Sequence, residues 1–169
     1  MRNRILGVAV GAGLLVAGLP GVAAADSSGG WTPVTYGPAE YKAGDVCSFG
    51  LREEFPTQGV EERVAETKPD GTPLRTDFRG PLIALYTNVA TGKQVEGDLS
   101  GVGTLWSLPD GWSLWNIPDN VGVTIHAGEP YHAKGEFVFS GGSVIAISPT
   151  HQHVILHQTT VTDVCAELS

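Results

Sequence analysis

The segment Val121-Gly-Val-Thr-Ile-His-Ala-Gly-Glu-Pro-Tyr-His-Ala-Lys-Gly-Glu-Phe-Val-Phe139 indicates the fold class of this 169-residue chain. Apolar side chains recur at every second position on both sides of Ala127-Gly-Glu-Pro130, which has the composition of a turn. A period of two is typical of strands with one buried and one solvated face, so the segment predicts two antiparallel strands. The expected buried residues are Val121, Val123, Ile125, Tyr131, Ala133, Gly135, Phe137 and Phe139. The expected solvent-facing residues are Thr124, His126, His132, Lys134 and Glu136.

The same period of two recurs through most of the chain after residue 45. It runs along residues 94–105 without a break, and it places Leu51 and Phe55 on one face of a strand with Arg52 and Glu54 on the other. Turn residues separate such segments at 68–71, 88–92, 108–111 and 140–142. The sequence therefore predicts one all-β domain over residues 45–169, built as an antiparallel meander of about eight or nine strands.

Glycines at positions that are expected to face the interior indicate that the meander closes on itself. Gly97, Gly101, Gly103 and Gly135 interrupt otherwise apolar faces, as in strongly coiled strands that curl onto themselves. Closure would also remove the exposed edges through which a secreted sheet protein aggregates. We therefore predict a small barrel, with a β-sandwich as the alternative.

The N-terminal residues have the charged, apolar and small-residue regions of a secretory signal peptide, in that order. Residues 1–25 begin with two arginines, continue with an uncharged apolar segment and end on small residues. The residues around the expected cleavage site are Ala23, Ala25 and Asp26. The apolar run is shorter than the roughly twenty residues that a membrane span needs. We therefore expect secretion to the extracellular space with no membrane span after cleavage, and residues 26–44 to form a flexible lead and a tether.

Removal of the signal peptide makes the chain more acidic. The whole sequence has a net charge of −8. Residues 1–25 contain two of the ten basic residues and none of the eighteen acidic ones, so eight remain against eighteen, a net charge of −10. Such a chain repels phosphate backbones, and its basic residues are interleaved with carboxylates. We therefore expect no nucleic acid partner.

Cys47 and Cys165 are the two cysteines of the chain. In an exported protein, two cysteines are expected to form a disulfide bond. They lie in the expected first and last strands, so the bridge would join the two ends of the fold, as in a sheet whose first and last strands are neighbours. A metal-binding or catalytic cysteine would need a nearby histidine or a Cys-x-x-Cys spacing, and the sequence has neither.

Several short motifs resemble a group of small secreted β-rich proteins of actinobacteria, to which no activity is assigned. The motifs are the signal peptide, the opening Ala-Gly-Asp-Val-Cys-Ser-Phe at 43–49, the Pro-Asp-Gly hairpins and the closing Asp163-Val-Cys-Ala-Glu-Leu-Ser169. The likeness covers most of residues 43–169. It implies a disulfide bond and a β-rich domain, and it implies no activity.

Three histidines near the C-terminus are a candidate metal site. On an unbroken strand they would point to one face, and neutral imidazoles at this spacing can hold zinc or copper. The alternative is a polar outer face, or a turn at 149–150 followed by a strand with Val154 and Leu156 in the core, in which case no cofactor is expected. The candidate ligands are His151, His153 and His157.

Three tryptophans lie beside the turn at 108–111. Exposed tryptophans next to a turn can stack on a ligand or anchor a partner surface. In the alternative interpretation, Trp106 and Trp112 pair across the hairpin and pack into the mouth of the barrel. The candidate contact residues are Trp106, Trp112 and Trp115.

Acidic pairs are the remaining candidates for chemistry. Glu53-Glu54 and Glu61-Glu62 suggest the two carboxyl groups of a glycosidase, but adjacent strand residues point to opposite faces. Pairing of Glu53 with Glu62 or Glu66 across strands stays open. The sequence has no Gly-x-Ser-x-Gly motif, so its catalytic residues, if any, are unknown.

These observations together predict a secreted, non-enzymatic β-barrel that binds a small ligand or a cell-surface partner. A lyase, isomerase or hydrolase built at the barrel mouth from His126, His132 and the 151–157 cluster is the first alternative. Metal binding by the three C-terminal histidines is the second.

Overall fold

The computed structural model describes residues 30–169, which form twelve strands and two short helices. The strands are β1 (Thr32–Pro33), β2 (Ala39–Tyr41), β3 (Leu51–Gln58), β4 (Glu61–Thr67), β5 (Pro73–Gly80), β6 (Leu82–Asn88), β7 (Gln94–Asp98), β8 (Gly101–Ser107), β9 (Ser113–Ile117), β10 (Val121–Ile125), β11 (Gly135–Ile147) and β12 (His153–Asp163). A 3₁₀ turn, η1 (Pro109–Gly111), joins β8 to β9, and α1 (Val164–Glu167) follows β12. Neither helix is long and apolar enough to cross a membrane. The predicted signal peptide, with Ala23, Ala25 and Asp26 at its cleavage site, lies outside the described residues.

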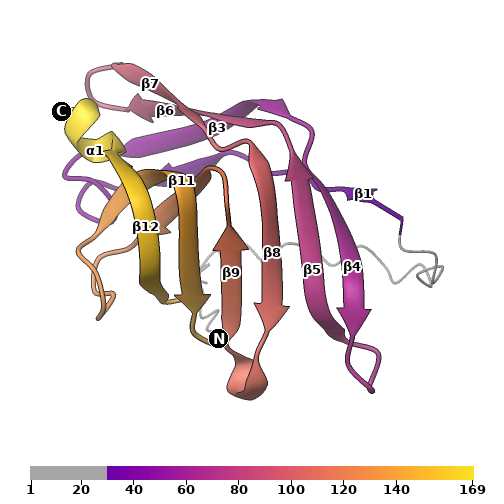
Figure 1. The fold of residues 1–169 in the computed structure, drawn as a ribbon. Coiled ribbons are helices and arrows are strands. Elements are labelled where there is room, and N and C mark those ends of the chain that lie inside the picture. Colours follow the sequence, from indigo (N-terminus) through magenta and orange to yellow (C-terminus); the bar gives the residue numbers. More distant parts are fainter. Residues whose placement is uncertain (1–29) are drawn as a thin grey trace, which may run out of the picture.

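The strands form two antiparallel sheets, which confirms the all-β, antiparallel prediction (Figure 1). The eight-stranded sheet has the order β1-β4-β5-β8-β9-β11-β10, and β12 pairs with β11. The four-stranded sheet has the order β2-β3-β6-β7. In Figure 1 the strands of the small sheet run across the upper end of the large one.

The sheets do not close into a barrel, so that prediction was wrong and a sandwich-like arrangement fits. The physical reason is that the described chain passes between the sheets four times, at 34–38, at 59–60, at Pro81 and at 99–100, and the last three crossings lie at one corner. The crossings are bonded to one another, because Gly59 N donates to Pro81 O and Leu99 N donates to Leu82 O, each at 2.8 Å. Among the described residues, the outer strands of the large sheet, β1, β10 and β12, do not pair with the outer strands of the small sheet, β2 and β7.

Gly80 shows why this corner needs glycine. Its φ is +132°, and a Cβ there would lie 2.2 Å from the carbonyl oxygen of Gly59. It also pairs with Gly101 across β5 and β8. Gly101, which was expected to coil a barrel, therefore lies beside Gly80 where the chain passes between sheets, and Gly80 allows the backbones to cross closely there.

Three local predictions also differ from the structure. Residues 94–105 alternate as one strand would, but they form β7 in the small sheet and β8 in the large one. The expected turn at 140–142 is a bulge inside β11, with φ of +74° at Gly141 and +112° at Gly142. Because of this bulge one strand pairs first with β10 and then with β9. The predicted tether at 26–44 contributes β1 and β2, which pair with β4 and β3.

The core has two clusters. One joins both sheets near the C-terminal helix and contains Val46, Cys47, Leu51, Ala84, Tyr86, Val138, Val164 and Leu168. The other gathers where β9, β10 and β11 meet and contains Ile117, Val123, Ile125, Phe139 and Ile145. The space between the sheets beside these clusters holds the candidate site.

The predicted disulfide is confirmed: Cys47 and Cys165 are bonded, with their Cα atoms 5.4 Å apart. Neither cysteine lies in a strand, because Cys47 is in the loop before β3 and Cys165 is in α1. The earliest strands do not pair with β12 either. The bridge therefore fastens the last helix to a loop of the small sheet, and it does not mark neighbouring first and last strands.

Candidate functional site

A cavity of about 250 Å³ lies between the two sheets at the corner where the chain crosses from one to the other. The small sheet contributes residues of β3 and β6, and the large sheet contributes residues of β5, β8, β9, β10 and β11. The residues that line it include Glu53, Phe55, Phe78, Arg79, Gly103, Trp115, Thr124 and Glu136.

The walls of the cavity are mainly apolar and aromatic. Phe78 and Trp115 stack with their ring centroids 5.2 Å apart, and Phe55 faces them from the small sheet. Gly103 leaves room beside this stack, because a Cβ built there would meet Ile117 and Trp115 only at 3.5 Å or more. The absence of a side chain at one strand position therefore keeps part of the space open.

Glu136 forms the polar inner end of the cavity. It is fully buried, and neither of its carboxyl oxygens has a hydrogen-bond partner among residues 30–169. On β11 it lies opposite Thr124 of β10, and the alternation of the strand turns it toward the space between the sheets together with Val138. Buried polar atoms are almost always hydrogen-bonded, so two unpartnered oxygens in a cavity wall mark this position for a ligand or for water.

Glu53 of β3 lines the same cavity and is 7% exposed. Its carboxylate accepts one long hydrogen bond, from the Tyr41 hydroxyl at 3.4 Å. The hydroxyl of Tyr86, a fully buried residue of β6, has no hydrogen-bond partner. Two carboxyl groups and two phenols thus gather where the small sheet faces β10 and β11.

Burial governs the protonation of this group. Burial, and then the carboxylate of Glu53, raise the pKa of Glu136 to about 8. The Thr124 and Tyr86 hydroxyls oppose the rise, but neither meets the geometry of a hydrogen bond with Glu136. Burial also raises the pKa of Glu53, and burial followed by the Glu53 charge raises the pKa of Tyr41 to about 12. At neutral pH the Glu136 carboxyl group therefore carries its proton.

Arg79 is the cation among the described residues that line the cavity, and it is already engaged. Its guanidinium donates two hydrogen bonds to Glu61, at 2.9 and 3.0 Å, and lies 4.0 Å from the ring centroid of Trp31. Its charge is therefore directed toward the outer face of β4 and β5, away from the two carboxyl groups.

Sequence reasoning missed this site. It placed Glu136 toward solvent, whereas the residue is fully buried. It correctly expected that Glu53 and Glu54 point to opposite faces, since Glu53 is buried and Glu54 is only half-buried. It left open a pair with Glu62 or Glu66, but those residues lie opposite β5 of the large sheet. The available signal was the position of Glu53 between Leu51 and Phe55 on the apolar face of a strand.

Comparisons with known proteins identify no relative of this chain. No protein-family model, no curated protein and no solved structure matches it.

The three C-terminal histidines do not share one strand face, which corrects the prediction. His151 lies in the turn before β12, with a φ of +61°, and a bulge separates Ile155 from His157. The predicted turn is present, but Leu156 is 59% exposed and Ile155 packs on the core instead. Within residues 30–169 no group of three or more histidine, cysteine or carboxylate side chains could hold a metal ion.

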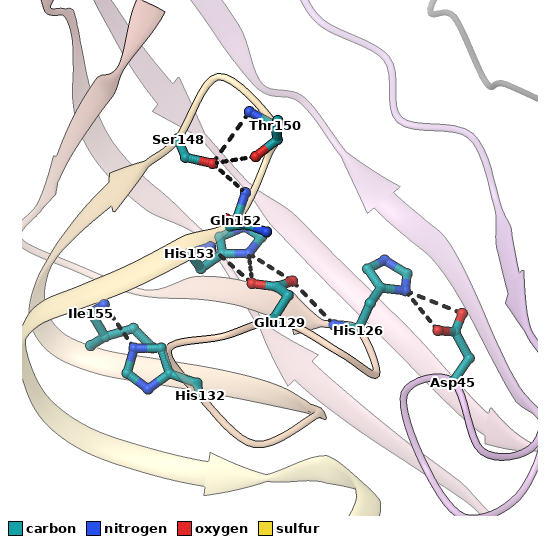
Figure 2. Close-up of polar contacts among 9 residues, drawn as sticks. All are labelled: Asp45, His126, Glu129, His132, Ser148, Thr150, Gln152, His153 and Ile155. Carbon is teal, nitrogen blue, oxygen red and sulfur yellow. Dashed lines mark hydrogen bonds and ion pairs between the residues drawn. The ribbon is translucent and has the colours of Figure 1, made fainter.

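Three histidines, His126, His132 and His153, instead fix the loop between β10 and β11 (Figure 2). The Nδ1 atom of His126 lies 3.1 Å from both carboxylate oxygens of Asp45, and the Ile155 amide donates to Nε2 of His132 at 3.0 Å. Glu129 accepts from the backbone amides of His126, at 3.2 Å, and His153, at 2.9 Å. No histidine lines the cavity between the sheets. Their role in the described structure is to attach this loop to β12 and to the loop before β3.

Glu129 is the centre of this attachment and permits a direct test. Burial opposes the ionised form, but the two backbone amides and the His153 ring lower the pKa of Glu129. A lowered pKa adds stability above the ordinary carboxyl pKa, and this stability is lost as the pH falls through the lowered value. We expect Glu129→Gln to cost about 1–2 kcal/mol at pH 7 and less in acid, measured by urea denaturation. Exposed Glu96 is the control, and an equal loss for Glu96→Gln would contradict the assignment.

The three tryptophans are all partly buried. Trp106 lies opposite Leu114 across the hairpin, so the pairing with Trp112 in the alternative interpretation does not form. The Arg75 guanidinium lies 5.5 Å from the ring centroid of Trp106. Trp115 lines the cavity, so of the three it is the one that the structure places at the candidate site.

Proposed function

We propose that the protein is secreted and binds a small, largely apolar molecule in the cavity between its two sheets. The observation that carries this proposal is an aromatic-walled cavity that ends on a fully buried carboxyl group with two unpartnered oxygens. Ligand sites typically combine an apolar lining with a few convergent polar groups, and this cavity has that composition.

The size of the cavity supports a small ligand. An apolar cavity of about 150 Å³ accommodates benzene, and this one measures about 250 Å³. By proportion it accepts a molecule of about ten non-hydrogen atoms. Drug-sized ligands need larger pockets, of about 300–1,000 Å³.

Two features support secretion. The first 25 residues have the charged, apolar and small-residue order of a signal peptide. The disulfide between Cys47 and Cys165 fits an oxidising compartment.

The cavity favours ligand binding over an enzyme built from histidines and over a surface role for the 106–115 hairpin. An enzyme built from histidines needs imidazoles at the site, and none lines the cavity. A surface role for the 106–115 hairpin needs exposed tryptophans, and its three are partly buried. A protein that binds a small ligand in this cavity can also bind a partner on the cell surface.

Filling the cavity from Gly103 tests the proposal. We expect the oxidised protein to bind 2-phenylethanol, a neutral aryl alcohol, and Gly103→Leu to weaken binding at least about tenfold in isothermal titration calorimetry, because the new side chain occupies the space beside Trp115. Gly103→Ala should have a smaller effect, since its added methyl group makes ordinary contacts.

Val161→Leu is the matched control, because Val161 is exposed on β12 and does not line the cavity. Circular dichroism should show that all three variants are folded. Wild-type binding that Gly103→Leu leaves unchanged would place the ligand elsewhere and overturn the proposal.

A further inference from the structure

The inner end of the cavity holds two carboxyl groups and no cation of its own. Glu136 comes from β11 of the large sheet and Glu53 from β3 of the small sheet. Arg79, the cation among the described lining residues, is held by Glu61 and Trp31. Negative charge that develops at this end is therefore not balanced from within the described protein.

A buried carboxylate without a partner is costly, so buried charges are normally paired and hydrogen-bonded. Glu136 has neither kind of partner, and Glu53 has only the long bond from Tyr41. A ligand group that carries a positive charge and several N–H donors would meet both needs at once. An ammonium group has three such donors.

The rest of the cavity also favours a cation on an apolar body. Phe55, Phe78 and Trp115 present aromatic side chains to the space. Aromatic faces attract cations and pack against apolar groups. The mature chain carries a net charge of −10 from eight basic and eighteen acidic residues, so its long-range field attracts cationic ligands as well.

We propose that the ligand is a primary amine on a small aromatic or aliphatic body, with its ammonium group bound between Glu53 and Glu136. This inference rests on the proposed function, since it names the class of molecule that the same cavity accepts.

Proton release is the signature of this mode of binding. Glu136 is faced by Glu53 of β3, Tyr41 of β2, Tyr86 of β6 and Thr124 of β10, while Arg79 of β5 is turned outward. Because the free carboxyl group of Glu136 is protonated at neutral pH, an ammonium ion must displace its proton in order to pair with it. Amine affinity should therefore rise by about tenfold per pH unit below pH 8, with about one proton released per amine bound.

The experiment compares three probes with one aryl body: 2-phenylethylamine, 2-phenylethanol and phenylacetate. Calorimetry on the oxidised protein is carried out at pH 6, 7 and 8, in two buffers of different ionisation heat, to count protons. We expect the amine to bind at least about tenfold more tightly than the alcohol at pH 8, and phenylacetate to bind least. Glu136→Gln should remove the pH dependence of amine binding and weaken it at least about tenfold more than it weakens alcohol binding.

Each outcome decides between the two proposals. Equal or tighter binding of the alcohol overturns the amine inference but keeps the apolar cavity as a ligand site. Preferential binding of phenylacetate overturns the inference in favour of an anion. Binding of no probe overturns the proposed function and the inference with it. Glu53→Gln is the second variant, and amine binding that neither substitution changes would also reject the amine site.

Discussion

Glu136→Gln is expected to stabilise the protein at alkaline pH by several kilocalories per mole. Burial raises the pKa of Glu136 from 4.5 to about 8, so the folded state holds this proton more tightly than the unfolded chain does. Stability therefore falls as the pH rises from about 4.5 to about 8. At about 1.4 kcal/mol per pKa unit, the loss reaches about 5 kcal/mol at pH 8 and above. Glutamine keeps the shape of the side chain and removes the ionisation, so the variant should avoid this loss.

Urea denaturation of the oxidised protein at pH 5 and pH 8 measures the effect. The variant and the wild type should differ by less than about 1 kcal/mol at pH 5, and the variant should be more stable by about 3–5 kcal/mol at pH 8. Glu54→Gln is the control, because Glu54 lies on the opposite face of β3 from Glu53 and outside the cavity at the corner. A wild type whose stability does not fall between these pH values would show that Glu136 is not desolvated.

The loss of stability caused by the burial of Glu136 has a functional implication. A sequence selected for stability alone would place an apolar or amide side chain in the wall between the sheets. Natural proteins accept such local costs mainly at functional sites. The carboxyl group that opposes folding above neutral pH is also the group with two free acceptors in the cavity. Glu136→Gln is thus expected to raise the free energy of unfolding above neutral pH and to lower the affinity for the ligand.

The strands could be predicted from the sequence, but the way the two sheets meet could not. The period of two and the Pro-Asp-Gly turns correctly indicate antiparallel hairpins such as β4–β5 and β8–β9. Alternation is a local property, however, and it continues across residues 99–100, where the chain leaves one sheet for the other. Glycines such as Gly101 suit a coiled strand and a sheet crossing equally well, so composition could not separate a barrel from a sandwich.

The candidate site was missed because both faces of β11 are covered. Phe137 and Phe139 pack in the cluster formed with β9 and β10, whereas Glu136 and Val138 face the space between the sheets. A two-residue period identifies two faces but does not state that one of them is wet. The apolar character of Phe137 and Phe139 therefore led to the wrong assignment of Glu136 to solvent. The histidine cluster failed for a related reason, since a turn and a bulge interrupt the strand that was assumed to be continuous.

Removal of the disulfide is expected to have the second large effect on stability. The bond joins residues 118 positions apart. In the chain-entropy model, closing a loop of this length stabilises the folded state by about 5 kcal/mol. Cys47 is also 1% exposed in the core cluster beside Leu168, so its loss leaves space in a packed region. We expect the double variant Cys47→Ala, Cys165→Ala to lose about 4–5 kcal/mol, measured by urea denaturation at pH 5, where Glu136 is protonated in the folded state.

The position of the disulfide bond predicts which part of the structure becomes less stable when the bond is removed. Since Cys165 lies in α1 and Cys47 in the loop before β3, the double variant should keep the hairpins of the large sheet and loosen the contact between the C-terminal helix and the small sheet. Hydrogen exchange should therefore speed up first at residues 164–168, and then in β3 and β6, which share their cluster. Reduction of the wild type should reproduce both results, and a reductant should leave the double variant unchanged. Exchange that speeds up at low denaturant as much in the hairpins of the large sheet as at residues 164–168 would contradict this local loosening at the helix.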